Sequence, residues 1–183
     1  PRLVADNWSG GSAKLDACME LVTAAVEGGH RILLFSQFTS MLELLAKRLD
    51  AEGISHFTLQ GSTPKPVRAE LVRRFNGGEV SVFLISLRAG GTGLNLTAAD
   101  IVIHYDPWWN VAAQNQATDR AYRIGQRNPV QVYRLIAQDT IEEKIVELQQ
   151  AKQSLADTVT GGADGAILSM NPEQLLQLLG EEA

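Results

Sequence analysis

Three polar side chains between residues 110 and 126 have the spacing of one helical face. Gln116 precedes Arg120 by four positions, and Arg120 precedes Arg123 by three, so a helix would project all three together. Paired guanidinium groups suit the charge that spreads over a phosphoryl group during its transfer. The alternative is a surface helix with an Asp119–Arg123 ion pair, and spacing alone does not separate the two.

A glycine-rich segment at residues 86–96 could bind an anion. Gly90, Gly91 and Gly93 fall within four positions, with Arg88 just before them. Glycine permits positive φ and lets a ligand approach the backbone, so repeated N–H groups there can form an anion-binding nest. The alternative is a flexible turn, which would be a poor use of so long a glycine-rich loop.

Two further loops carry polar groups that suit phosphate contacts. Residues 36–39 and 60–64 each follow an apolar run and offer hydroxyl, amide and backbone N–H groups. The alternative is that these hydroxyls only cap the helices that follow, through Ser36 or Thr39 in the first loop and through Ser62 or Thr63 in the second.

Aromatic side chains follow a later apolar run, where Trp108 and Trp109 come directly after Asp106-Pro107. Tryptophan beside a polar loop can stack on a base or sugar, or it can belong to the core. His104, inside the apolar run, is expected to be structural, and Cys18 is expected to lie in the core.

Several classes of site are excluded. No GxxxxGK[ST] motif occurs and no acidic pair follows a strand, so the chain should not hydrolyse a nucleoside triphosphate unaided. One cysteine and three scattered histidines exclude an internal disulfide and a cysteine-rich or histidine metal site. No apolar run approaches the roughly 20 residues that span a bilayer. The start at Pro1 indicates a fragment of a longer protein, expected in a reducing, intracellular setting.

Elements that position these loops alternate between helix and strand. With 183 residues, 45% of them hydrophobic, the chain can bury a core. Apolar runs predict five strands, at residues 31–35, 54–59, 80–85, 101–105 and 130–136. Capping residues and apolar stripes predict helices at 12–27, from 39 to Gly53, from 62 or 63 to Gly77, at 110–124, 140–159 and 173–179. This alternation predicts an α/β protein, with a mainly parallel sheet covered by helices on both faces.

The charge distribution favours a nucleic-acid partner more than the net charge does. The whole chain carries −5, yet residues 60–134 carry +4 and the remainder −9. A basic middle between acidic ends can place a positive face on an acidic protein. The alternative is that solvated arginines fall there by chance.

The segments ILLFSQF (32–38), GSTPKPVRAELVRRFN (61–76), LISLRAGGTGLNL (84–96), ADIVIHYDPWWN (99–110) and QATDRAYRIGQ (116–126) resemble a known set of ordered motifs. They resemble the helicase motifs of the carboxyl-terminal RecA-like lobe of SWI/SNF-type ATPases, which are superfamily-two translocases on double-stranded DNA. The resemblance covers residues 12–150, and the Arg–x–x–Arg–Ile–Gly–Gln ending is its most specific part.

The resemblance implies an intact enzyme with two RecA-like lobes and ATP in the cleft between them. The missing amino-terminal lobe would supply the P-loop lysine and hold Mg²⁺, so neither ATP nor Mg²⁺ is expected on this fragment alone. Family positions match Arg120 and Arg123 as catalytic arginine fingers, Gly91, Gly93 and Gln116 as nucleotide contacts, and Ser36, Gln37, Thr63, Arg88, Thr92 and Trp109 as DNA contacts.

The resemblance also implies an organisation for the chain. Residues 1–11 would be a linker from the missing lobe, 12–138 the RecA-like lobe, 139–160 a brace helix and 161–183 a tail. Expected partners are double-stranded DNA, the amino-terminal lobe and DNA-bound proteins, with no membrane. The expected location is the cytoplasm or nucleoid in a bacterium or archaeon, and the nucleus in a eukaryote. Two alternatives stay open: a non-catalytic DNA- or protein-binding module, and a lobe of an RNA helicase of the same superfamily.

Overall fold

The computed structural model describes residues 11–87, 94–108, 111–119 and 129–160. The elements are α1 (Ala13–Glu27), β1 (Ile32–Ser36), α2 (Thr39–Ala51), β2 (His56–Leu59), α3 (Lys65–Asn76), β3 (Val82–Ser86), β4 (Ile101–His104), α4 (Val111–Thr118), β5 (Gln131–Arg134) and α5 (Ile141–Thr160). The chain forms two units, Pro1–Ile145 and Val146–Ala183. The sheet and α1–α4 belong to the first unit, and most of α5 belongs to the second.

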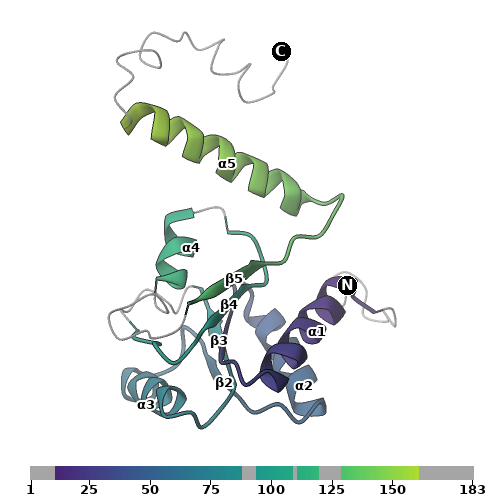
Figure 1. Cartoon of the computed structure of the whole chain (residues 1–183), viewed down its shortest axis with the longest axis vertical. Helices are drawn as coiled ribbons and strands as arrows, with labels where there is room; N and C mark the ends of the chain where they lie inside the picture. The colour runs from purple at the N-terminus through teal and green to yellow at the C-terminus, as the bar shows by residue number, and fades with distance from the viewer. Residues whose placement is uncertain (1–10, 88–93, 109–110, 120–128, 161–183) are drawn as a thin grey trace. The chain divides into compact units, whose positions relative to one another are not determined.

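The five strands form one parallel sheet in the order β2-β3-β1-β4-β5 (Figure 1). Central β1 pairs with β3 on one side and with β4 on the other, in a register that sets Phe35 beside Ile85 and His104. Every residue of β1, β3 and β4 is buried, as expected for strands covered on both faces. The predicted α/β architecture is therefore confirmed.

Each face of the sheet has its own hydrophobic core, because successive side chains of a strand point to opposite faces. One core joins Ile32 and Leu34 to helices α1 and α2, and the other joins Leu33 and Phe35 to α3 and α4. Figure 1 shows α1 and α2 on one side of the sheet, and α3 and α4 on the other. The fixed right hand of crossovers explains this split, since the chain leaves β1 toward one edge of the sheet and leaves β4 toward the other.

The helix starts follow the sequence signals in one case and depart from them in another. Ser12 caps α1 as predicted, and its hydroxyl accepts a hydrogen bond from the N–H of Leu15 at 3.4 Å. The capping of α3 by Ser62 or Thr63 is wrong, because the N-cap is Pro64, which makes no side-chain bond. The capping of α2 by Ser36 or Thr39 is also wrong, because that N-cap is Phe38.

The ends of the described elements lie within three residues of the predicted ones, except for the end of helix α4. Helix α4 is described only as far as Thr118, and the rest of the predicted helix 110–124 lies largely outside the described residues, as does 173–179. Strand β5 is shorter than predicted, since it runs from Gln131 to Arg134. Among the helices described, none is both long and apolar enough to cross a membrane.

Candidate functional site at the carboxyl edge of the sheet

The carboxyl ends of β1 and β4 meet at the point where the sheet changes winding direction. Helix α2 follows β1 and packs on one face, whereas α4 follows β4 and packs on the other. In parallel α/β sheets the crevice outside such a switch point is where ligands bind. The residues that follow β1 and β4 therefore form the first place to look for a site.

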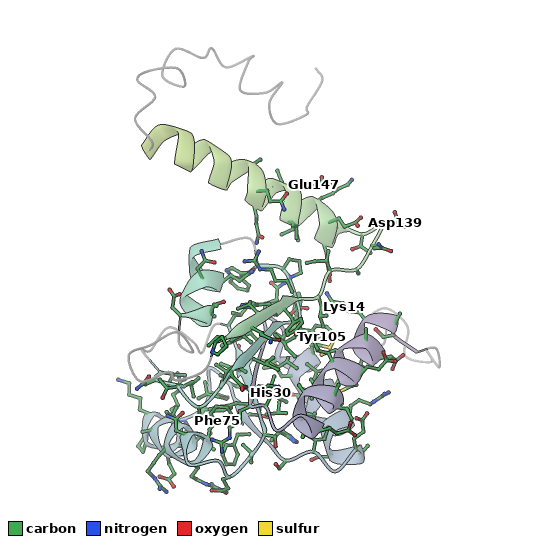
Figure 2. All side chains as sticks on the ribbon, viewed as in Figure 1. Lys14, His30, Phe75, Tyr105, Asp139 and Glu147 are labelled. Atoms are coloured by element: carbon green, nitrogen blue, oxygen red, sulfur yellow. The ribbon has the colours of Figure 1, made fainter. Side chains whose placement is uncertain are left out.

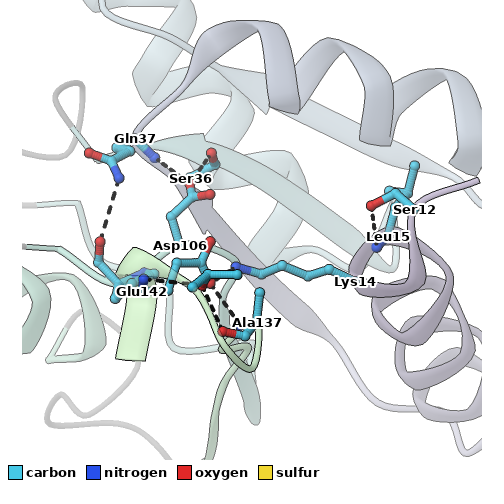
Figure 3. Close-up of polar contacts among 10 residues, drawn as sticks. Ser12, Lys14, Leu15, Ser36, Gln37, Asp106, Ala137 and Glu142 are labelled. Carbon is cyan, nitrogen blue, oxygen red and sulfur yellow. Dashed lines mark hydrogen bonds and ion pairs between the residues drawn. The ribbon is translucent and has the colours of Figure 1, made fainter. Parts of the chain in front are cut away.

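A buried carboxylate connects the two strand ends. The hydroxyl of Ser36 donates to Oδ2 of Asp106 at 2.5 Å, and the backbone N–H of Gln37 donates to the same oxygen at 3.1 Å (Figure 3). The N–H of Phe38 donates in turn to the Ser36 hydroxyl at 3.1 Å. Since a hydroxyl has one proton, Ser36 gives its only hydrogen to Asp106. Ser36 thus holds the loop inside the protein, and half-buried Gln37 is the more accessible of the two.

Burial dominates the electrostatics of Asp106, whose side chain is 6% exposed. Burial raises its pKa, while the Ser36 hydroxyl, the Gln37 N–H and the positive charge of Lys14 act in the opposite direction. Burial also raises the pKa of the neighbouring Tyr105 hydroxyl. The strand ends thus hold a carboxylate whose charge depends on a few fixed donors.

Lys14 in the first turn of α1 completes this polar cluster. Its ammonium forms an ion pair with Glu142 at the start of α5 (Figure 3). The same ammonium lies 5.0 Å from the centre of the Tyr105 ring, and Figure 2 labels both residues. Glu142 also accepts the backbone N–H of Ala137 at 2.9 Å (Figure 3). The pair is largely shielded, with 14% and 22% of the two side chains exposed. The first turn of α1 and the first turn of α5 are thereby attached to the same edge.

A second polar loop follows β2. The hydroxyl of Thr63 accepts the N–H of Gln60 at 3.1 Å, and the N–H of Thr63 donates to the Gln60 carbonyl at 3.1 Å. From α3, the Arg68 guanidinium donates to the carbonyls of Thr63 at 2.7 Å, Gly61 at 2.7 Å and Gln60 at 3.4 Å. The loop is therefore a closed turn held by a cation. It lies two strands from Ser36, because β3 separates β2 from β1.

The predicted site residues divide by what the structure describes. Ser36 and Gln37 lie together at the end of β1, and Thr63 lies in the loop after β2. Gln116 belongs to α4, but its side chain is not among those described. The other predicted site residues lie outside the described residues: Gly91, Gly93, Arg88, Thr92, Trp109, Arg120 and Arg123.

Sequence reasoning missed two residues of this edge: Asp106 and Arg68. Asp106 had a signal, since it is an acid placed directly after a buried strand, but its partner lies 70 positions away. The part of the chain that the structure describes contains no cluster of three His, Cys, Asp or Glu side chains able to hold a metal ion.

Comparisons with known proteins cover most of the chain. Residues 13–125 match the family described as helicase conserved C-terminal domain. The putative ATP-dependent helicase/translocase YwqA of Bacillus subtilis is 43% identical over 171 residues, which are 93% of this chain and 18% of that protein. The chromatin-remodeling ATPase INO80 of Homo sapiens is 41% identical over 169 residues, which are 92% of this chain and 11% of that protein. The chain thus spans less than a fifth of the length of these relatives.

A solved structure extends the similarity to three dimensions. The crystal structure of the C-terminal part of the Fun30 ATPase domain superposes with a TM-score of 0.72 at 37% sequence identity. The match covers 75% of this chain and 45% of that one. The parallel sheet with helices on both faces is therefore the fold that this ATPase part also has.

Proposed function

The chain belongs to the helicase conserved C-terminal domain family, as the RecA-like C-terminal lobe of a SWI/SNF-type ATPase, and on that premise we propose that it is one of two motor lobes of an ATP-driven translocase on double-stranded DNA. The other lobe supplies the P-loop lysine and the acidic residues that hold Mg²⁺. This lobe supplies two arginines to the nucleotide and a row of contacts to the DNA backbone.

Strand order is the observation that carries this proposal. Strands β3 and β4 flank β1 in the sheet, and their carboxyl ends lie beside Ser36 and Gln37. The glycine-rich residues 88–93 follow β3 within a few positions, and residues 109–126 follow β4 in the same way. The motif segments that follow β1, β3 and β4 therefore all begin at the carboxyl ends of three adjacent strands, around the switch point of the sheet. Only the motif segment after β2 begins elsewhere.

The nucleotide roles fall to the segments after β3 and β4. In the proposal, Gly91 and Gly93 lie against the nucleotide, and Gln116 contacts it from α4. Arg120 and Arg123 reach the γ-phosphate when the two lobes close, and they stabilise the negative charge that spreads over the phosphoryl oxygens during hydrolysis. Each guanidinium is pre-formed and fully charged, so little reorganisation is needed at the moment of reaction.

The DNA roles fall to side chains around the same edge. Gln37, Thr63, Arg88 and Thr92 contact phosphates, and Trp109 approaches the groove. Ser36 supports this row through its buried bond to Asp106, which holds the backbone of Gln37 in place. Closure and reopening of the cleft shift these contacts relative to those of the other lobe, and the cycle steps along one strand.

The proposal is tested by Arg123→Ala in the intact protein. We expect ATP turnover to fall roughly 10³-fold or more, while the affinity for duplex DNA changes little. Arg73→Ala is the matched control, because Arg73 is an exposed arginine paired with Glu70 on α3. Near-normal turnover of Arg123→Ala would refute the assignment. Stimulation of turnover by RNA or single-stranded DNA rather than by duplex DNA would favour a helicase acting on single strands.

A further inference from the structure

A buried histidine connects β4 to α4 on the side of the sheet away from Lys14. His104 is 1% exposed, and its Nε2 lies 2.9 Å from the hydroxyl oxygen of Thr118, the last residue of α4. The imidazole stacks on the ring of Phe35, with 5.5 Å between ring centres and 21° between planes. His104 therefore lies between the end of β1 and the end of α4.

The hydrogen-bond pattern fixes the proton on this ring. The Thr118 hydroxyl donates to the carbonyl of Gln114 at 3.2 Å, one turn earlier in α4. With the single Thr118 proton donated to the Gln114 carbonyl, the Thr118 oxygen accepts from His104, and we assign the ring hydrogen to Nε2. The other nitrogen, Nδ1, is then a bare acceptor, and it has no hydrogen-bond partner among the described residues.

The neutral state agrees with this geometry. Burial lowers the pKa of His104 to about 4, and the positive charge of Arg134 acts in the same direction. A phenyl ring of similar shape would stack on Phe35 equally well and would bury no unpaired acceptor. What a phenyl ring lacks is the N–H that reaches α4.

The His104–Thr118 bond lies at the last residue of the described part of α4. Gln114 holds the start of the helix by accepting the N–H of Trp108 at 3.3 Å, and Ala117 packs into the core below. Thr118 is the last residue of the described helix. Arg120 and Arg123 follow it in the sequence by two and five positions. A shift of Thr118 would therefore move the start of the segment that carries both arginines.

We propose that His104 is a positioning residue for the arginine pair, acting through its hydrogen bond to Thr118. The inference rests on the proposed function, since it assigns no chemistry to His104 itself. Holding a catalytic group within a fraction of an ångström matters because misplacement by about 1 Å can cost on the order of 10²-fold in rate. The His104–Thr118 bond fixes the last residue of the described part of α4, and the two arginines follow that residue in the sequence by two and five positions.

The test is a double-substitution cycle in the intact protein. His104→Phe keeps the ring and removes the donor, Thr118→Val removes the hydroxyl, and Thr118→Ser restores it. We expect each of the first two variants to lower kcat about tenfold or more with little change in DNA affinity. The double variant should lose no more than the worse single variant, and Thr118→Ser should keep near-normal kcat.

Ligand binding separates positioning from general damage to the fold. The affinity for ADP with aluminium fluoride, a mimic of the transferring phosphoryl group, should fall with kcat, whereas the affinity for ADP alone should hold. His56→Phe is the matched control, because His56 lies on edge strand β2 and its Nδ1 contacts the nearby carbonyl of Ile54 at 3.3 Å and the exposed carboxylate of Asp50 at 3.8 Å, neither of which belongs to α4. It should leave kcat unchanged.

The outcomes distinguish two kinds of failure. Unchanged kcat in His104→Phe and Thr118→Val, additive losses in the double variant, or equal losses in ADP and DNA affinity would each overturn the positioning role. If Arg123→Ala itself retains turnover, the proposed function fails first. If Arg123→Ala abolishes turnover while the cycle shows no coupling, the proposed function stands and only the role of His104 is lost.

Discussion

Ser36 and Asp106 are 70 positions apart in the chain, yet their side chains form a 2.5 Å hydrogen bond at the ends of adjacent strands. The parallel register explains the meeting, because Phe35 pairs with His104 and each strand then continues by one or two residues to the same edge. One carboxylate oxygen accepts from both the Ser36 hydroxyl and the Gln37 N–H. The loops that leave toward opposite faces are thus connected at their starting points.

Two substitutions of Asp106 should show whether its charge or its hydrogen bonds contribute more to the stability of the fold. Asp106→Ala leaves the Ser36 hydroxyl and Gln37 N–H without their acceptor, and we expect the free energy of unfolding to fall by about 2–4 kcal/mol. Asp106→Asn keeps an oxygen that can accept these hydrogen bonds, and it carries no charge. Burial of the native charge is unfavourable, as the raised pKa of Asp106 indicates. Asp106→Asn should therefore stay close to wild type at pH 7. Urea unfolding measures both variants, with Asp16→Ala as the control, because the Asp16 side chain is 49% exposed. Equal losses in the two Asp106 variants would contradict the argument.

Lowering the pH should reduce the free energy of unfolding, because His104 is buried in its neutral form. Its pKa is lowered from 6.5 to about 4 in the folded protein, so between these values the unfolded chain binds a proton that the folded chain does not. Stability is therefore complete above pH 6.5 and falls as the pH drops toward 4, by up to about 3 kcal/mol. His104→Phe should flatten this part of the profile. Wild-type and His104→Phe stability curves that run parallel from pH 7 to pH 4 would show that the histidine is not the cause.

Arg68 should matter more to the fold than its neighbours on α3. Its planar guanidinium reaches three carbonyls of the loop after β2, which a lysine ammonium cannot do with the same geometry. We expect Arg68→Lys to lower the free energy of unfolding by about 1–2 kcal/mol. Arg73→Lys should have no measurable effect, because the Arg73–Glu70 pair is 73% and 50% exposed. Equal denaturation midpoints for the two variants would show that the loop does not depend on this cation.

The 183-residue chain by itself should have no ATPase activity, because its sequence contains no P-loop motif. It should bind duplex DNA weakly, with an affinity that falls steeply as salt is raised. Phosphate release and fluorescence anisotropy with labelled duplex, measured over a salt series, check both expectations. Turnover by the purified chain would contradict the two-lobe account.

The fold was predictable where burial makes a continuous signal. The runs ILLFS and VFLIS are buried at every position, so apolar composition alone located β1 and β3 to within two residues. Capping was harder to predict, because the Thr63 hydroxyl bonds the N–H of Gln60, which lies before it, instead of the helix after it. Local propensity cannot distinguish these two uses of one hydroxyl.

The candidate site was predictable only as a set of segments. Polar residues at the strand ends indicated this edge of the sheet as the place to look, since the carboxyl ends of parallel strands all lie there. The hydrogen-bond partners within the site could not be predicted from the sequence. Asp106 meets Ser36 because of the register of β1 with β4, and His104 meets Thr118 because of the packing of α4. The roles of Arg120 and Arg123 stay predictions, because both lie outside the described residues.

The sulfur chemistry of the chain has a practical consequence. Cys18 is the single cysteine of the 183 residues, it is fully buried on α1, and burial raises the pKa of its thiol to about 12. At neutral pH a thiol held in this way reacts poorly with maleimide dyes. A cysteine introduced on an exposed helix position would therefore be the labelled site on this lobe, and energy transfer to a second dye could follow lobe movement without removal of the native cysteine.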